Sequence, residues 1–336
     1  MRKALIGLTM GDAAGIGPEL TVKVFSDRIL MEMADMIVIG DSGILSEAIK
    51  MVNSDMTINT VGSVDEAVFK EGRMNVLDLK NIDVSLHASG KTNSECGRAA
   101  CEYTEVAVKL ALSGEIDAIA SAPVNKDAMH LAGYDHAGQT EFIASLTNTH
   151  EFGMVLYFGP VKLFYVTNHV SLRDALDNVR KNIILSKIKF IHETLAGLGG
   201  KNNSIAVAAI NPHAGEAGRM GRDEIEEIIP AVEAARELGI DALGPFPADT
   251  LFIKAKEGAY GAVLAMYHDQ GNIAAKLMGF GSGVTAISGL PIIRTSVAHG
   301  TAFDIAGKGI ASPDTLIQAV RLAVELVEAR EEKRGV

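Results

Sequence analysis

Short apolar runs alternate with longer segments of helical periodicity along the 336-residue chain. Strand-like apolar runs occupy residues 4–9, 35–41, 115–124, 162–169, 204–213 and 261–269. Helical patterns occupy residues 18–34, the segment up to about 52, and residues 94–113, 171–198 and 222–238, with a last helix from Ser312 or Asp314. Because parallel neighbours in a sheet need long, usually helical crossovers, this alternation predicts an α/β fold with a mostly parallel sheet.

The composition limits the class of protein. A hydrophobic content of 48% and a mean hydropathy of +0.19 indicate a compact globular chain. No apolar run approaches the ~20 residues of a membrane span, and the N-terminus lacks a secretory signal, so we expect a cytoplasmic protein. The net charge of −11 argues against nucleic-acid binding but permits a small anionic substrate in a locally basic pocket. Cys96 and Cys101 provide no disulfide framework and are interpreted as structural.

Three histidines lie where a polar loop follows an apolar, strand-like run, namely His169, His213 and His268. Open α/β sheets place ligands at the carboxyl ends of their strands. Three imidazoles converging there would bind a divalent metal and leave coordination positions open. The chain has nine histidines, and any single one is more often structural or superficial than a ligand. Carboxylates close to two of the three, Glu216 and Asp269, favour the metal interpretation.

The first loop, TMGDAAGIGPEL, carries Gly11, Gly15 and Gly17 between a predicted strand and a predicted helix. Glycine permits the tight turn that this position needs. The spacing matches neither the Rossmann GxGxxG fingerprint nor a P-loop. Backbone N–H groups at the start of the helix could face an anion, although the loop could equally be a simple turn.

Residues 289–313, GLPIIRTSVAHGTAFDIAGKGIASP, are rich in glycine, serine and threonine and end just before the last helix. The stretch predicts an ordered loop that is long enough to be functional. Gly300, Gly307 and Gly309 allow close approach of the backbone to a flat ligand. Arg294 could form bidentate hydrogen bonds to a phosphate or a carboxylate.

Four further polar residues are weaker candidates. Gln139 and Thr140 supply neutral hydrogen-bond partners in AGQTEFIA, and Asp249 is a lone acid in PADTLF. Lys276, a short distance beyond His268, would suit a phosphate. Each of these residues, taken alone, is more often a cap, a turn residue or a solvated surface group.

Taken together, these segments resemble the PdxA family of NAD-dependent dehydrogenases. The resemblance runs through nearly the whole chain and rests on MGDAAGIGPEL, SAPVNK, GQTEF, NHVSLRDAL, NPHAGEAG, PADTLF, MYHDQG and GLPIIRTSVAHGTAFDIAGKG. The last block is also similar to the HGSAPDIAGKG loop of isocitrate and isopropylmalate dehydrogenases, which holds the adenosine half of NAD without a Rossmann domain. The resemblance implies their fold, with two α/β/α domains around a cleft and mixed, mostly parallel sheets.

The resemblance also implies a homodimer with a shared active site, in which one metal-ligating histidine comes from the partner subunit. We expect a cofactor-side α/β domain in residues 1–125 plus 280–336. Residues 126–279 would form the domain for metal, substrate and dimerisation.

The resemblance implies roles for individual residues. The ligands of one divalent ion, which could be Zn, Mg, Mn or Co, would be His169, His213 and His268. Substrate contacts would come from Gln139, Thr140, Lys276, Thr285 and Arg294. NAD contacts would come from Gly11, Asp12, His299, Gly300, Thr301, Asp304 and Ile305. The proton acceptor would be Asp249, Asp269 or Lys126, and the sequence does not choose among them.

Three positions depart from the pyridoxine-biosynthetic member of the family: Gln139 replaces the His of GHTE, Thr285 replaces an Asn, and Ala13 replaces a Pro. The segment VSLRDAL after His169 looks more like the branch that acts on D-threonate or D-erythronate 4-phosphate. An imidazole and a carboxamide offer different donors and acceptors. We therefore expect a hydroxyl group at C2 of the substrate.

The expected reaction is NAD- and metal-dependent oxidation at C3 and decarboxylation, giving dihydroxyacetone phosphate. The alternative substrate is 4-hydroxy-L-threonine 4-phosphate, which would give 3-amino-2-oxopropyl phosphate. A cyclic diol carboxylate is a further alternative, but it would not need phosphate contacts from Lys276 and Arg294. A non-enzymatic binding protein for metal or sugar phosphate is the last alternative, and the intact HGTAFDIAGKG loop argues against it.

Overall fold

A computed structural model describes residues 2–85, 87–198, 202–278 and 283–335. The chain divides into two compact units. Unit 1 is Met1–Gly153 with Val284–Glu328, and unit 2 is Met154–Gly283 with Ala329–Val336. Both units have mixed, mostly parallel sheets with helices on their faces, as the alternating pattern predicts.

The described residues of unit 1 form seven strands. They are β1 (Ala4–Thr9), β2 (Ala34–Gly40), β3 (Thr57–Val61), β4 (Arg73–Asp78), β5 (Ala118–Ser121), β11 (Val284–Ser288) and β12 (Ile293–Val297). Their order is β3-β4-β2-β1-β5-β12-β11, and among these described strands only the β11–β12 pair is antiparallel. The inner strands are buried on both faces, which is why they appear in the sequence as continuous apolar runs.

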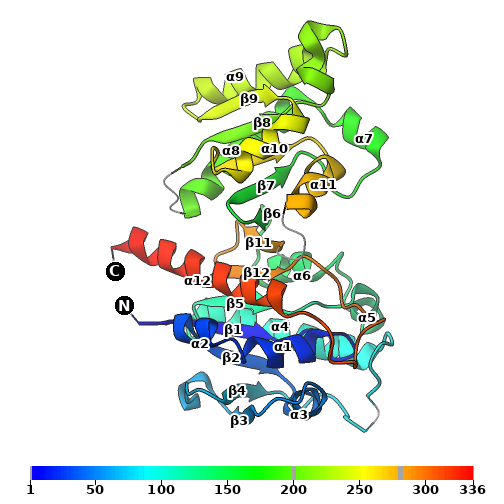
Figure 1. Cartoon of the computed structure of the whole chain (residues 1–336), viewed down its shortest axis with the longest axis vertical. Coiled ribbons are helices and arrows are strands. Elements are labelled where there is room, and N and C mark those ends of the chain that lie inside the picture. Colours follow the sequence, from blue (N-terminus) through cyan, green and yellow to red (C-terminus); the bar gives the residue numbers. More distant parts are fainter. Residues whose placement is uncertain (1, 86, 199–201, 279–282, 336) are drawn as a thin grey trace. The chain divides into compact units, whose positions relative to one another are not determined.

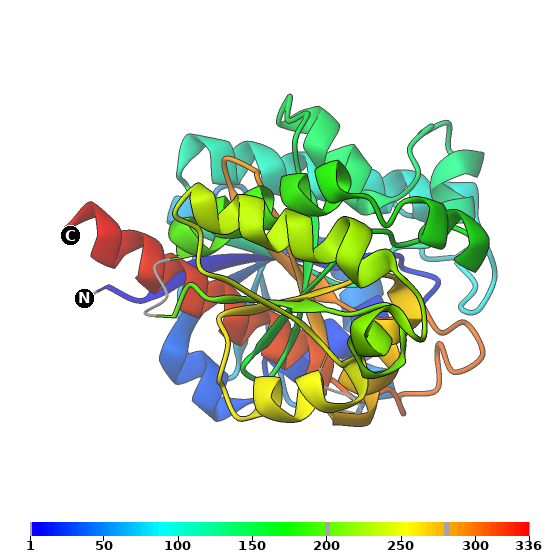
Figure 2. The ribbon, with the colours of Figure 1, turned by 90° about the horizontal axis from the view of Figure 1, so that it is seen from above.

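The helical segments of unit 1 are α1 (Gly17–Val24), α2 (Arg28–Met33), α3 (Ser42–Met51), the short η1 (Val64–Glu66), α4 (Ser94–Ser113), α5 (Lys126–Leu131), α6 (Gln139–Leu146) and most of α12 (Asp314–Arg334). Helix α4 packs on β1, β2 and β5 from one face of the sheet, whereas α1 and α12 lie on the other face (Figures 1 and 2). The predicted range of α4 is confirmed. Asn93 caps its first turn through the N–H of Glu95, and Gly114 ends it in a left-handed conformation.

Unit 2 has the strand order β6-β7-β10-β8-β9, and in its described part only the β6–β7 pair is antiparallel. The strands are β6 (Gly153–Phe158), β7 (Val161–Tyr165), β8 (Ile205–Ala208), β9 (Ala242–Phe246) and β10 (Ala262–Ala265). The helical segments are α7 (Leu172–Asp177), α8 (Lys181–Leu198), η2 (Pro212–Gly218), η3 (Glu224–Ile228), α9 (Ile229–Glu237), α10 (Ala248–Lys256) and α11 (His268–Met278). Helices α8 and α9 cover one face of this sheet, and α10 and α11 cover the other (Figure 2).

Three local predictions are wrong. The helix expected over 18–34 is broken into α1 and α2, because the Asp27 side chain accepts a hydrogen bond from Leu30 N and starts a new helix. The helix expected over 171–198 is likewise two helices, α7 and α8. Residues 289–313 are not all loop, since β12 lies within them and pairs with β5. Arg294 therefore stands on a central strand.

The boundary expected after residue 125 is displaced, because residues 126–153 belong to unit 1. Helices α5 and α6 pack on α4 through a small core of Cys101, Met129 and Phe142. This packing places Lys126, Gln139 and Thr140 in the same unit as Arg294.

The close packing of α4 on α5 gives a stability prediction. A Cβ at Gly97 would collide with the carbonyl oxygen of Ala128, whereas a Cβ at Gly197 on α8 would meet no atom of the described residues within 4 Å. We expect Gly97→Ala to lower the free energy of unfolding by about 1–3 kcal/mol. The control Gly197→Ala should leave it unchanged or raise it by up to ~1 kcal/mol. Denaturant titration of the two variants measures both values, and a fully stable Gly97→Ala protein would contradict the packing.

Candidate active site

In unit 2 the three histidines follow three neighbouring parallel strands. Strand β10 lies between β7 and β8, so the carboxyl ends of all three strands lie at one edge of the sheet. His169 follows β7, His213 follows β8, and His268 begins α11 just after β10. Backbone hydrogen bonds from Val166 and Thr167 continue the pairing of the two strands beyond β7. As a result, the rings of His169 and His268 lie 5.6 Å apart between centroids.

Asp269 orients the ring of His268. Its Oδ1 lies 2.7 Å from Nδ1 of His268. Because a carboxylate only accepts hydrogen bonds, this contact places the proton on Nδ1 and leaves Nε2 available to a ligand. Next to this pair, Tyr165 stacks on the His268 ring at 6.2 Å, and the buried Asn168 Oδ1 has no hydrogen-bond partner among the described residues.

His213 lies on a backbone turn of unusual conformation. The five residues from His213 to Ala217 all have positive φ values, although only Gly215 is a glycine. Left-handed backbone costs an L-residue roughly 1–2 kcal/mol, and such strain is found preferentially at functional sites. The buried carboxylate of Glu224 holds the turn by accepting hydrogen bonds from the N–H groups of Ile210 and Asn211, at 2.9 and 2.8 Å.

The described residues of one chain contain no group of three or more histidine, cysteine, aspartate or glutamate side chains placed to hold a metal ion. Within that part of the chain, His213 makes no ring contact with His169 or His268. The donor chemistry of the two adjacent imidazoles, with Nε2 of His268 free, fits a divalent cation once a third ligand is added. Two of the three histidines expected from the sequence are thus adjacent within one chain.

The other candidates in unit 2 lie on helices. Asp249 is exposed in the first turn of α10, and Lys276 is exposed near the end of α11. Gln270 joins two strand ends, since its Oε1 accepts from Met266 N at 2.7 Å and its Nε2 donates to Ala209 O at 2.6 Å. Gln270 thereby ties the segment before His268 to the end of β8.

In unit 1 the expected substrate residues gather around Arg294. The Arg294 side chain on β12 is only 4% exposed, and no carboxylate of the described residues lies within the 4 Å of an ion pair. Its Nη2 donates to Gln139 Oε1 at 2.5 Å, and its Nε donates to Ser121 Oγ at 3.2 Å. Burial lowers the pKa of Arg294 to about 10, and the charge of Glu141 opposes that fall. The site thus holds a desolvated cation beside neutral hydrogen-bond partners.

Lys126 and Glu141 both lie close to Gly138, the residue before Gln139. A Cβ at Gly138 would lie 3.2 Å from Lys126 Cε and 3.3 Å from Glu141 Oε2. Thr140 is half-buried in the first turn of α6. Thr285 is buried on β11, where its hydroxyl points to Ser296 O at 3.4 Å.

Four N–H groups of the first loop are hydrogen-bonded within the protein. Asp12 N donates to Pro123 O, Ala14 N to Asp12 Oδ1, Gly15 N to Asp12 O and Ile16 N to Thr301 O. These four N–H groups, which precede α1, are therefore not available to an anion. The tight turn itself is observed, since Gly11 has a φ of +73°.

Asp12 is a buried acid with a perturbed pKa. Its side chain is fully buried, and Oδ2 accepts no hydrogen bond of normal geometry from the described residues. Burial raises the pKa of Asp12 to about 6, while the backbone N–H groups of Ala14 and Asn125 limit the rise. Such an acid could gain a donor from a ligand.

The expected cofactor loop packs on the first loop. Thr301 is buried against Gly15, whereas His299, Gly300 and Asp304 are exposed, with open space beside Gly300. Glu19 of α1 accepts from the N–H groups of Gly309 and Ala311, at 2.9 and 2.6 Å, and so holds the far end of the loop.

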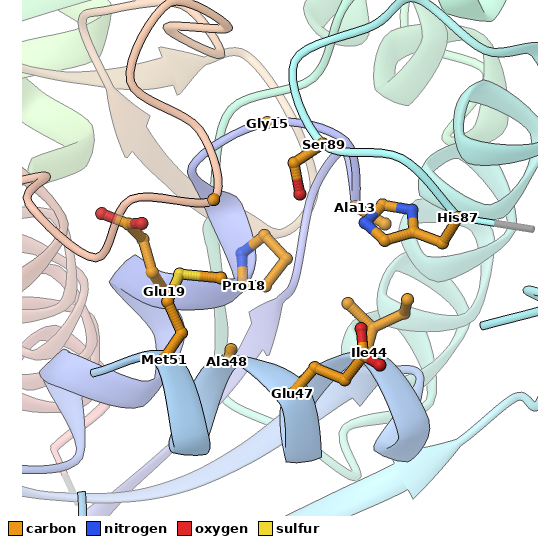
Figure 3. Close-up of a pocket in the computed structure, with 11 residues that line it drawn as sticks. Ala13, Gly15, Pro18, Glu19, Ile44, Glu47, Ala48, Met51, His87 and Ser89 are labelled. Carbon is orange, nitrogen blue, oxygen red and sulfur yellow. The ribbon is translucent and has the colours of Figure 1, made fainter. Parts of the chain in front are cut away.

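A small hollow lies between α1, α3 and the segment around His87 and Ser89 (Figure 3). Glu19 and Glu47 bring carboxylates to its wall, and Gly307 completes it. Its volume of about 30 Å³ admits one or two water molecules, not an adenosine.

The sequence analysis missed several residues that position the site. They are Glu224, which holds the His213 turn, Gln270, which joins two strand ends, Glu19, which holds the 309–311 segment, and Ser121 and Thr104, which are hydrogen-bonded to Arg294 and Gln139. Their partners lie up to 292 residues away in the chain, so no local pattern marks them.

The chain matches known proteins over nearly its whole length. The family model described as "Pyridoxal phosphate biosynthetic protein PdxA" matches residues 32–323. A protein of Oceanobacillus iheyensis named "Putative D-threonate 4-phosphate dehydrogenase" is 45% identical over 331 residues, 98% of this chain and 99% of that protein. A protein of the same name from Halalkalibacterium halodurans is 42% identical over 324 residues, 96% and 97% of the two chains. The crystal structure of 4-hydroxythreonine-4-phosphate dehydrogenase from Klebsiella pneumoniae has a TM-score of 0.89 at 40% identity, covering 97% and 98%.

These relatives, which the chain matches over nearly its whole length, show an oxidoreductase of the dehydrogenase class. The chain belongs to the PdxA family, and the resemblance seen in its motifs is confirmed. No helix of the described residues combines the length and apolar character needed to cross a bilayer.

The buried Asp12 predicts a pH-dependent contribution to stability. Its pKa is 3.8 in its ordinary state and about 6 in the fold, so folding disfavours its ionised form. The destabilisation caused by this buried charge is absent below pH ~4. It grows as the pH rises to ~6 and reaches about 3 kcal/mol above that pH. Asp12→Asn removes the ionisable group and with it this destabilisation. As the pH rises from ~4 to ~6, the free energy of unfolding of the variant should therefore increase relative to that of the wild type. A constant difference between the two proteins across that range would contradict the raised pKa.

Proposed function

We propose that this protein oxidises a 4-phosphorylated four-carbon acid at C3 with NAD and decarboxylates it, with D-threonate or D-erythronate 4-phosphate as substrate and dihydroxyacetone phosphate as product. The curated relatives at 42% and 45% identity carry D-threonate 4-phosphate in their names, which supports this substrate class. Gln139 and Thr285 stand where the pyridoxine-biosynthetic pattern has His and Asn, which favours a hydroxyl at C2.

The buried Arg294 is the observation that carries the proposal. A desolvated guanidinium without a carboxylate partner is unfavourable in the free protein. A substrate with two anionic groups compensates that charge, and the planar fork suits either phosphate or carboxylate. Gln139, Thr140 and Thr285 then orient the substrate hydroxyls, and Lys276 adds a second cation for the phosphate.

The three candidates for the proton acceptor now differ in their surroundings. Asp269 is engaged with Nδ1 of His268, so we assign it the orientation of that ring. Lys126 lies in the same unit as Arg294, and Asp249 lies at the start of α10. Lys126 or Asp249 accepts the C3 hydroxyl proton in this proposal.

His169, His213 and His268 would hold the divalent ion, which supplies Lewis-acid polarisation of the substrate oxygens when bound. The loops around Asp12 and from His299 to Ile305 would hold NAD, which supplies the hydride acceptor. In the residues of this chain, Asp269 keeps Nε2 of His268 free and Glu224 holds His213 on its strained turn.

A second copy of the chain would complete the site. Large apolar side chains next to two of the histidine loops are exposed, namely Val170, Leu172, Leu176 and Met220. Neighbouring exposed apolar groups of this kind mark association surfaces in soluble proteins. The partial metal site of one chain agrees with a dimer in which one of the three imidazoles crosses from the partner.

The substrate and the metal can be tested together. NADH formation should be at least about tenfold more efficient, as kcat/KM, with the threonate or erythronate phosphate than with 4-hydroxythreonine 4-phosphate. Unphosphorylated D-threonate is the control for the phosphate contact. Chelation should abolish turnover, and an added divalent ion should restore it. Full activity after complete metal removal would refute the metal site.

The shared site predicts recovery in mixed dimers. His169→Ala and His213→Ala should each be inactive alone. If His213 comes from the partner, mixed dimers contain one intact site, and random exchange restores about a quarter of wild-type activity. His169→Ala with His268→Ala is the control pair, which should not recover because these two rings lie in one chain. Recovery in neither pair, with subunit exchange verified by mass, would place all three ligands in one chain.

A further inference from the structure

The carboxamide of Gln139 is held in one orientation from both of its ends. Arg294 Nη2 contacts its oxygen at 2.5 Å, and Thr104 Oγ1 contacts its nitrogen at 3.1 Å. A guanidinium has only donors, so the atom that it meets must be the carbonyl oxygen. Thr104 donates its hydroxyl hydrogen to Ala100 O at 2.9 Å, so toward Gln139 it can only accept. Each group therefore donates to the next in a fixed order: Arg294 to Gln139, Gln139 to Thr104, and Thr104 to Ala100.

This chain of donors determines what Gln139 has left for a ligand. Of its two N–H bonds one is used by Thr104, and its oxygen is already bound to a cation. The remaining N–H suits an oxygen with a lone pair, such as a hydroxyl. An ammonium has donors only, and it would face this N–H with the buried guanidinium of Arg294 behind it.

We propose that Arg294 and Thr104 lock the Gln139 carboxamide with its N–H toward the substrate, so that the site selects a hydroxyl and rejects an ammonium at C2. The inference rests on the proposed function, in which Gln139 contacts the substrate. Arg294 and Thr104 act here as positioning residues as well, because they set the direction in which Gln139 donates.

Gln139→Glu tests the lock with a nearly isosteric change. The carboxylate keeps an oxygen for Arg294 but presents an acceptor where the amide presented a donor. An acid in the first turn of α6 is favourable for the helix, so the variant should fold. We expect the ratio of kcat/KM for D-threonate 4-phosphate over 4-hydroxythreonine 4-phosphate to fall at least about tenfold, equivalent to about 1.4 kcal/mol.

A matched control separates donor direction from net charge. Gln139→Glu adds a negative charge near Arg294, and Glu141→Gln, two residues along α6, removes one. The double variant Gln139→Glu/Glu141→Gln restores the charge but keeps the acceptor. If the lock sets selectivity, the double variant keeps the lowered ratio. A return to the wild-type ratio would show that charge alone decides, and this would overturn the proposal.

Two further readouts keep the inference distinct from the proposed function. The rise in melting temperature caused by each phosphate without NAD reports binding alone, and it should show the same change of preference in Gln139→Glu. Thr104→Val, an isosteric loss of the acceptor, should weaken the preference, and Thr104→Ser should retain it.

If the wild type turns over neither phosphate, the proposed function fails. If it turns over the hydroxy acid but Gln139→Glu leaves both preferences unchanged, the lock alone fails.

Discussion

A cation removed from water must be compensated by the groups around it, and Arg294 imposes that constraint on the site of unit 1. Strands β12 and β5 pair so that its Nε reaches Ser121, and α6 brings Gln139 to its Nη2. Neither neighbour carries a charge, so the guanidinium is hydrogen-bonded but its charge is not neutralised. The burial that lowers its pKa also strengthens its attraction for an anionic ligand, because both effects arise from the low local dielectric.

In unit 2 the main constraint is the orientation of histidine side chains that lie in or next to loops. Parallel pairing of β7 with β10 brings two rings together, and Asp269 sets the proton of one of them. The turn of His213 is strained, and the carboxylate of Glu224 offsets that strain with charge-assisted hydrogen bonds of roughly 1.5–3 kcal/mol each. The strained backbone thus coincides with the position of His213.

Elements with strong local signals follow the sequence closely. Helix α4 runs over its predicted range because Asn93 caps it and Gly114 ends it, and strand β1 matches its apolar run. The break at Asp27 had a signal as well, since aspartate is a common helix cap, but the apolar periodicity on both sides concealed it. Strand β12 was concealed in the same way, because the glycines and threonines around it are typical of loops.

By itself the sequence determined the alternation of strands and helices, the family, and the placement of three histidines after apolar strands. These follow from periodicity and from short motifs, which operate within a few residues of the chain. Only the tertiary structure decided that His169 meets His268, and that Arg294 meets a glutamine 155 residues before it. It alone decided the direction of that amide as well, because a hydrogen-bond direction depends on which donors and acceptors the packing of distant segments leaves unused.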